Sequence, residues 1–240
     1  MSQFFLWIVA LQDKDMGFNL NKIAPWGRSF DEYVAMFALS EGDLGKSILG
    51  CADGPASFNA ELTRRDGKVL SLDPLYKFSS EEIKGRIDET FHEIMSQTHE
   101  HAHEFVWERI PYVEKLGRVR MEAMEDFLSD YSRGLKEHRY IAAGLPKLPF
   151  EDGEFELALC SHFLFLYSEQ LSLEFHVQSI KELVRVAGEA RIFPLLELGT
   201  KKSRHLEVAI HKLEAEEMQI DIETVPYEFQ IGGNQMLRIK

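Results

Sequence analysis

The sequence predicts an α/β fold: a seven-stranded, mostly parallel sheet with helices on both faces. Short apolar runs alternate with segments whose apolar residues recur at helical spacing, a pattern typical of parallel sheets covered on both sides. The last two apolar runs follow each other across a loop at Gly232-Gly233, which predicts one antiparallel strand near the C-terminus. The stretch 76–139 has no strand pattern and predicts a helical insertion after the second strand.

The first half of the sheet is preceded by a helix with a clear start signal. Ser29 and Glu32 have the spacing of a capping box, and apolar residues then recur at helical spacing. Gly67 ends the next helix, because glycine destabilises helix interiors. The expected elements are a helix over 29–39, a loop over 41–43, a strand over 47–51, a helix over 57–65 and a strand over 69–72.

The insertion is expected to hold two or three helices. Ser79 and Glu82 form a second possible capping box, and Pro111 restarts the apolar pattern. A connection between parallel strands needs about a dozen residues or a few more, so this segment is longer than the connection requires. The elements expected after it are strands over 140–143, 155–160, 190–196, 220–225 and 235–239, with helices over 173–186 and 205–218.

Charge and cysteine content limit the possible partners. The formal net charge of −13 argues against a nucleic-acid partner, because phosphate binding requires a clustered basic face. Cys51 and Cys160 each end an apolar run, which suits buried thiols of a reduced, cytoplasmic protein. The apolar run 4–11 is too short to span a bilayer and lacks a basic flank, so we expect a buried segment and no membrane association.

Small residues follow the first strand, and an acidic residue ends the second. The turn Ala52-Asp-Gly-Pro-Ala56 lets the backbone approach a ligand closely, and the helix after it presents free N–H groups. Asp73 stands 19 residues after Gly54, a spacing at which a carboxylate accepts hydrogen bonds from ribose hydroxyls. The pair predicts a nucleoside-bearing cofactor without deciding which one.

A longer block narrows the choice of cofactor. The stretch Leu148-Pro-Phe-Glu-Asp-Gly-Glu-Phe-Glu-Leu-Ala-Leu-Cys-Ser161 resembles the segment that leads into the fourth strand of class I S-adenosylmethionine (SAM)-dependent methyltransferases, whose fold is Rossmann-like. Lys181-Glu-Leu-Val-Arg-Val186 is similar to the next helix of that family, and the terminal strand pair matches its antiparallel seventh strand. The resemblance implies a SAM-dependent methyltransferase with three parts. These are an N-terminal segment over 1–46 that packs on the cofactor site, a SAM-binding domain over 47–75 and 140–240, and an inserted lid or dimer surface over 76–139.

The resemblance also implies roles for individual residues. The turn Ala52-Asp53-Gly54-Pro55-Ala56 would lie under the methionine part of SAM, and Cys51 before it is a further cofactor-binding candidate. Asp73 would hold the ribose hydroxyls, Pro74 or Leu75 would pack on the adenine, and Leu145 would border the adenine ring. Ser161 and His162 would face the sulfonium and the acceptor. Arg28 precedes the first strand, where the family often has a helix that closes over the cofactor. It is either a partner of the methionine carboxylate, since arginine favours bidentate contacts with carboxylates, or a surface arginine beside a buried Trp26.

The turn departs from the family pattern. Gly50 stands where the family usually has an acid, and Ala52 and Ala56 replace two glycines. Asp53 is the candidate to replace the missing acid near the methionine amino group. These departures leave open a SAM-binding or regulatory protein without transferase activity. An NAD(P)-dependent oxidoreductase is disfavoured, because Gly50, Ala52 and Pro55 occupy the glycine positions of G-x-G-x-x-G.

His162 is the best-placed candidate base for a small-molecule acceptor, with Tyr167 as the second candidate and His176 behind them. Transfer from a bound sulfonium mainly requires positioning and exclusion of water, and a base helps only where the acceptor carries a proton. The alternative for His162 is a histidine that lines the pocket without moving a proton.

The insertion contains a histidine-rich motif. His99-Glu-His-Ala-His103 matches the H-E-x-x-H pattern of zinc proteases, in which both histidines share one helix face. Nothing else in the sequence supports a zinc protease, so we expect a solvated helix face and no metal site.

Overall fold

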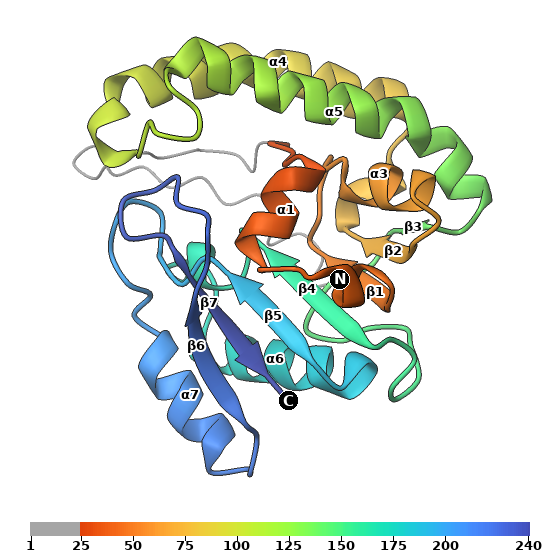
Figure 1. Ribbon diagram of the computed structural model, residues 1–240, viewed down its shortest axis with the longest axis vertical. Coiled ribbons are helices and arrows are strands. Elements are labelled where there is room, and N and C mark those ends of the chain that lie inside the picture. Colours follow the sequence, from red (N-terminus) through yellow and green to blue (C-terminus); the bar gives the residue numbers. More distant parts are fainter. Residues whose placement is uncertain (1–24) are drawn as a thin grey trace, which may run out of the picture.

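A seven-stranded sheet forms the centre of the computed structural model, which describes residues 25–240 (Figure 1). The strands follow the order β3-β2-β1-β4-β5-β7-β6, and β7 runs antiparallel to both of its neighbours while the other pairs are parallel. The predicted fold class, a mostly parallel Rossmann-like sheet of the methyltransferase type, is therefore confirmed. The apolar run 4–11 lies outside the described residues.

The elements follow the predicted order along the chain. The strands are β1 Ser47–Cys51, β2 Lys68–Leu72, β3 Tyr140–Ile141, β4 Leu157–Ser161, β5 Ala190–Phe193, β6 Ile220–Thr224 and β7 Gln235–Ile239. The α-helices are α1 Phe30–Met36, α2 Glu41–Leu44, α3 Phe58–Arg64, α4 Ser80–Glu100, α5 Val113–Lys136, α6 Leu173–Ala187 and α7 Leu206–Glu214. Short 3-10 turns are η2 Pro74–Lys77, η3 Ala102–Glu104 and η4 Phe165–Tyr167.

Local signals account for most helix starts, and one of them corrects a prediction. The capping boxes at Ser29 and Ser79 are both formed. The predicted loop over 41–43 is wrong, because those residues begin α2. Ser40 and Asp43 form a third capping box: each backbone N–H donates to the other side chain over 3.1 Å, which satisfies two otherwise free donors.

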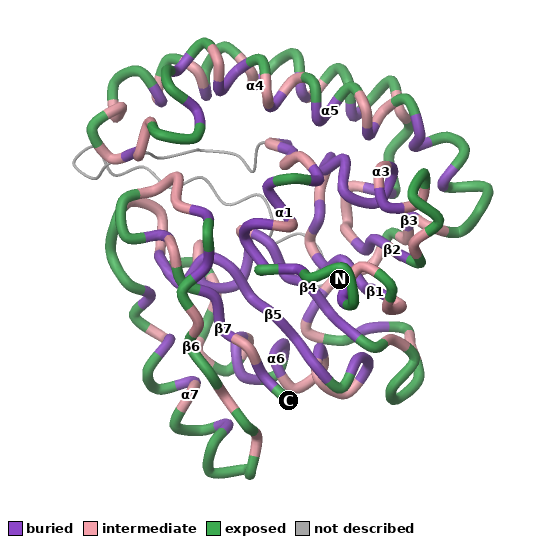
Figure 2. Tube along the Cα trace, in the orientation of Figure 1, coloured by how far each residue is buried: buried purple, intermediate pink, exposed green. Residues whose placement is uncertain are grey.

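The core occupies both faces of the sheet, as a parallel sheet requires. In β1, Leu49 and Cys51 pack in the cluster with α6 and α7, whereas Ile48, the residue before Leu49, packs in the cluster with α1 and α3. This alternation follows from the two-residue period of a strand. Figure 2 accordingly shows the central strands as buried over nearly their whole length.

The insertion is a pair of long helices that cross one end of the molecule (Figure 1). The segment between α4 and α5 pairs with the loop between β6 and β7. Val106 N–H donates to the carbonyl of Phe229 over 2.8 Å, and Ile231 N–H donates to the carbonyl of Glu104 over 3.0 Å. The far end of the insertion is therefore tied to the C-terminal part of the chain. None of the helices in the described residues is long and apolar enough to cross a membrane.

Candidate functional site

The candidate site lies at the carboxyl ends of β1, β2 and β4. The chain runs outward from β1 to β2 and β3, then crosses back to β4 on the other side of β1, so the crevice between β1 and β4 is a topological switch point. Ligands of open α/β sheets bind at such a point. The turn after β1, Asp73 after β2 and His162 after β4 all lie at this edge, as the sequence predicts.

The turn after β1 keeps glycine-like geometry although alanine occupies its first position. Ala52 has a φ of 58°, in the left-handed region that glycine favours, and Gly54 has a φ of 53°. A Cβ atom built on Gly54 would meet no described atom within 4 Å, so the space above the turn is open. The turn can therefore accept a ligand close to its backbone.

The strain at Ala52 gives the first testable prediction. Ala52→Gly is expected to raise the free energy of unfolding by about 1 kcal/mol, because a left-handed alanine costs roughly that much. Ala60→Gly, in the interior of α3, is the matched control and is expected to lower the free energy of unfolding by about 1 kcal/mol. Urea denaturation measures both values. Destabilisation by both substitutions would show that Ala52 is not strained.

Asp53 fills the space left by Gly50. A Cβ atom on Gly50 would lie 1.9 Å from Asp53 Oδ2, so the carboxylate occupies the position of the missing side chain. Tyr33 donates its hydroxyl to Oδ1 over 2.9 Å, and Ser71 donates to Oδ2 over 2.6 Å. Burial raises the pKa of Asp53 to about 7 against these two hydrogen bonds. An acid thus stands beside the end of β1, supplied by the turn instead of the strand.

Asp73 joins the turn to the second strand. Gly54 N–H donates to its Oδ2 over 2.9 Å, and Leu75 N–H donates to its Oδ1 over 2.7 Å. Burial raises the pKa of Asp73, and these two backbone hydrogen bonds oppose the shift. Each carboxylate oxygen retains a lone pair, so the group can still accept hydrogen bonds from a ligand.

The residues predicted to border an adenine lie next to Asp73. Pro74 and Gly144 approach each other, since a Cβ atom on Gly144 would lie 3.3 Å from Pro74 Cγ. Leu145 is buried, and Leu75 packs on the aromatic cluster around Tyr76. Cys51 differs from the other candidates because its side chain is in the core, so only its backbone can reach a ligand.

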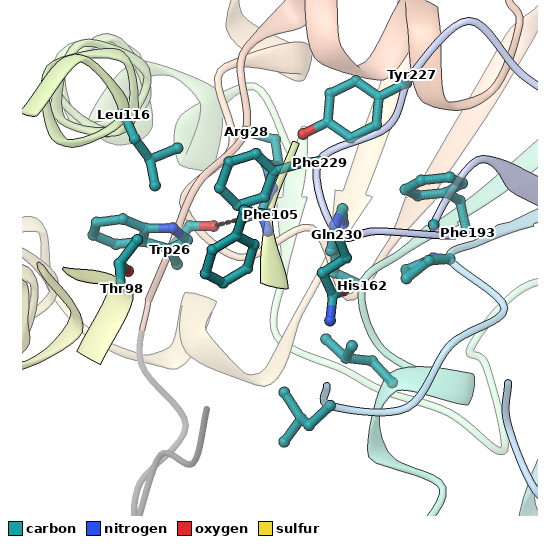
Figure 3. A pocket seen from close by; sticks show the side chains of 14 residues that line it. Trp26, Arg28, Thr98, Phe105, Leu116, His162, Phe193, Tyr227, Phe229 and Gln230 are labelled. Carbon is teal, nitrogen blue, oxygen red and sulfur yellow. Dashed lines mark hydrogen bonds between the residues drawn. The ribbon is translucent and has the colours of Figure 1, made fainter. Parts of the chain in front are cut away.

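A cavity of about 80 Å³ opens beside the switch point (Figure 3). Its wall is mostly apolar and comes from the N-terminal segment, α4, α5 and the loops after β4, β5 and β6. The lining includes Arg28, His162, Phe193, Tyr227, Phe229 and Gln230. Figure 3 shows Trp26 and Leu116 across the cavity from His162. The insertion therefore supplies part of the wall.

His162 combines a strained backbone with an altered pKa. Its φ is 49°, and its N–H donates to the carbonyl of Phe193 over 2.6 Å. Its Nδ1 lies 2.9 Å from Ser161 Oγ. Burial, together with the charges of Arg28 and Arg120, holds the pKa of His162 well below its usual range, so the imidazole is neutral near pH 7. Strained residues of this kind cluster at functional sites.

The other candidate bases lie elsewhere. Tyr167 is outside the described lining of the cavity and packs against Phe163, with a pKa raised by burial. His176 is fully buried in α6, where its ring nitrogens lie 2.8 Å and 2.9 Å from the carbonyls of Ser172 and Leu164. Of the three candidates, the structure brings His162 alone to the cavity wall among the described residues.

A buried ion pair near the cavity is absent from the sequence predictions. Arg120 of α5 and Glu32 of α1 pair directly, and Tyr227 donates its hydroxyl to Glu32 Oε1 over 2.8 Å. Burial opposes ionisation of Glu32, but Arg120 outweighs it and holds the pKa of Glu32 at about 2. The available signal was a charged residue at position 120 within the apolar stripe that includes Leu116 and Phe127.

The histidine-rich segment does not form a single helical face. α4 ends at Glu100, so His99 lies on the helix while His103 lies in the following 3-10 turn. His99 is exposed and pairs with Glu114. Within residues 25–240, no group of three or more histidine, cysteine, aspartate or glutamate side chains is arranged to hold a metal ion.

Comparisons with known proteins give one close relative and several distant structures. No model of a known protein family matches the chain. The magnesium protoporphyrin IX methyltransferase of Synechocystis, crystallised with SAM, is 14% identical, with 88% of this chain and 76% of that chain covered and a TM-score of 0.42. A SAM-dependent methyltransferase from Aquifex aeolicus is 15% identical, with coverage of 88% and 87% and a TM-score of 0.42.

The sequence relative is much closer. The uncharacterized protein MJ0045 of Methanocaldococcus jannaschii is 35% identical over 225 residues, which cover 92% of this chain and 98% of that protein. With this identity over almost the full length of both proteins, the chain belongs to the family of MJ0045 and has the Rossmann-like fold of the class I methyltransferases.

Proposed function

We propose that this protein transfers a methyl group from SAM to a small-molecule acceptor. The observation that carries the proposal is the pairing of the open turn after β1 with Asp73 after β2, at the switch point of the sheet. A nucleoside with an attached amino acid suits this arrangement: the Asp73 carboxylate would face the ribose, and the turn would lie under the rest of the molecule. The SAM-methyltransferase resemblance of residues 148–161 supports the choice of cofactor.

The residues divide into three groups around such a cofactor. Asp73 would accept the ribose hydroxyls, with Pro74, Leu75 and Leu145 beside the adenine. The backbone from Cys51 to Gly54 would lie under the methionine, with Asp53 toward its ammonium group. Arg28 would hold the methionine carboxylate, since its own carbonyl accepts the N–H of Ser57 at the end of the turn, over 3.0 Å. Ser161 and His162 would lie near the sulfur.

Methyl transfer from SAM requires the protein mainly to position the methyl donor and the acceptor. SAM supplies an activated methyl group on a sulfonium sulfur. The apolar cavity wall excludes water and confines the acceptor, and the neutral His162 can accept a hydrogen bond or a proton from an acceptor that carries one. The two insertion helices would act as the lid of this cavity. The buried free thiols of Cys51 and Cys160 fit a reducing, cytoplasmic setting.

Asp53 makes the expected SAM affinity depend on pH. Its pKa of about 7 means that the carboxyl is largely protonated below that pH, whereas the ammonium group of SAM favours the ionised form. SAM affinity is therefore expected to rise as the pH increases from 5.5 to 7.5, by about tenfold per pH unit well below the pKa. Calorimetric titrations across this range measure the effect. Asp53→Asn is expected to give a flat profile, and a flat wild-type profile would remove Asp53 from the ammonium site.

A thermal-shift experiment with SAM, S-adenosylhomocysteine (SAH) and NADH tests the cofactor. A ligand that binds only the folded state raises Tm, so both SAM compounds are expected to raise it and NADH is not. No shift with either SAM compound at millimolar concentration would contradict the proposal.

A second experiment separates a transferase from a protein that only binds SAM. SAH release is measured after adding either the low-molecular-mass or the macromolecular fraction of a cell extract. Release that depends on the low-molecular-mass fraction is expected. Binding of SAM without release in either fraction would favour a non-catalytic role.

A further inference from the structure

Arg120 presents an unused hydrogen-bonding edge inside the protein. Its side chain is completely buried, and its Nη1 donates to Glu32. Its Nε and Nη2 are buried as well and have no hydrogen-bond partner among residues 25–240. These two nitrogens form one side of the planar guanidinium, the side that binds a carboxylate through two parallel N–H···O bonds. Buried donors of a charged group that lack a hydrogen-bond partner lower the stability of the folded protein. A ligand that accepts hydrogen bonds from this edge would remove that cost.

The guanidinium of Arg120 lies close to the cavity, although Arg120 is not itself among the lining residues. Arg120 lies one helical turn after Leu116 on α5, and Leu116 lines the cavity. The guanidinium carbon lies 5.9 Å from the ring centre of Phe229, and Tyr227 hydrogen-bonds the same Glu32; both aromatic residues also line the cavity. Only side chains of the cavity wall therefore separate the cavity from this guanidinium.

Two cationic side chains lie at or near the cavity. Arg28 and Arg120 bring two positive charges, while Glu32 is the carboxylate that neutralises Arg120. Arg28 has no ion pair among the described residues, and its buried Nε has no hydrogen-bond partner there. Burial is the largest cause of the lowered pKa of His162, and the charges of Arg28 and Arg120 lower this pKa further.

We infer that the acceptor is a small organic carboxylic acid, bound as its anion with the carboxylate on the Nε–Nη2 edge of Arg120 and the apolar part in the cavity. This deepens the proposed function and rests on it. A single carboxylate matches the planar two-nitrogen edge. A phosphate group fits this edge less well, because the apolar cavity offers its third oxygen few donors.

Butyrate and butyramide are suitable probes, since they have the same size and differ in charge. Ligand-observed NMR measures their Kd on protein saturated with SAH. Wild type is expected to bind butyrate at least about tenfold tighter than butyramide, the effect of charge-assisted hydrogen bonds. The double variant Glu32→Gln/Arg120→Met removes the whole ion pair and is expected to bring this ratio close to one.

Two further variants keep the test independent of folding. Arg120→Lys retains a cation beside Glu32 but lacks the planar edge, and is expected to lose most of the preference for butyrate. Asp43→Asn/Arg191→Met removes a buried ion pair near the amino end of β5, at 3.0 Å, and is expected to keep the wild-type ratio. Equal binding of both probes by wild type, or an unchanged ratio in Glu32→Gln/Arg120→Met, would overturn the inference.

The amino-acid carboxylate of the cofactor is a second anion that could bind the Nε–Nη2 edge of Arg120. SAH carries the amino-acid carboxylate and 5′-methylthioadenosine lacks it, so their affinities are compared in wild type and in Glu32→Gln/Arg120→Met. Loss of the SAH advantage in the variant would place the cofactor on Arg120 and overturn the inference. Failure of the proposed function gives a different result: SAH does not bind, while SAH-free protein still prefers butyrate to butyramide.

Discussion

Asp73→Ala is expected to weaken SAH binding by at least about 100-fold, as measured by calorimetry. The carboxylate would accept two ribose hydroxyls, and each hydrogen bond to a charged group contributes about 1.5–3 kcal/mol. The same carboxylate accepts the N–H groups of Gly54 and Leu75, so its removal also loosens the turn over the cofactor.

Two variants separate ribose binding from general damage. Asp73→Asn keeps the shape of the side chain and one acceptor oxygen, and is expected to give an intermediate affinity. Asp88→Ala removes a carboxylate that is 52% exposed on α4 and is expected to bind SAH as wild type does. An Asp73→Ala variant with wild-type affinity would exclude Asp73 from the ribose site.

Glu32→Ala is expected to lower the free energy of unfolding by about 3–5 kcal/mol, the usual cost of removing one partner from a buried ion pair. The substitution leaves the completely buried Arg120 without a counter-charge. It also removes the acceptor of the Tyr227 hydroxyl and half of the capping box that begins α1. One carboxylate thus connects α1, α5 and the loop between β6 and β7.

A partly exposed carboxylate provides the control for this loss. Glu61 pairs with Arg64 and Arg65 on the surface, and Glu61→Ala is expected to cost less than about 1 kcal/mol.

The effect of Glu32→Ala on the free energy of unfolding also depends on pH. Because the folded-state pKa of about 2 lies below the ordinary 4.5, the contribution of Glu32 is complete above pH 4.5 and disappears toward pH 2. A loss below 1 kcal/mol at pH 7 would show that Glu32 is not needed to neutralise Arg120.

The helices and strands that the sequence predicted best are those that depend on contacts between residues near each other in sequence. The capping boxes at Ser29 and Ser79, the helical apolar spacing of the insertion and the terminal strand pair all describe contacts between residues that are near in sequence. The third capping box, at Ser40, has the same kind of signal but lies in a helix of four residues, too short to show apolar periodicity. β5 ends at Phe193, earlier than predicted, because Pro194 has no N–H to donate to a neighbouring strand.

The sequence by itself determined the fold class, the order of the elements and the edge of the sheet that carries Asp73 and His162. Tertiary structure alone decided which side chains meet there. The Asp53 carboxylate fills the space where a side chain at position 50 would lie, because the turn folds back over Gly50. Strand and helix patterns in the sequence do not predict this contact. Arg120 meets Glu32 across 88 positions of sequence, and the cavity wall joins segments from both ends of the described chain. Local patterns record whether a residue is buried, whereas its partner depends on how distant elements pack.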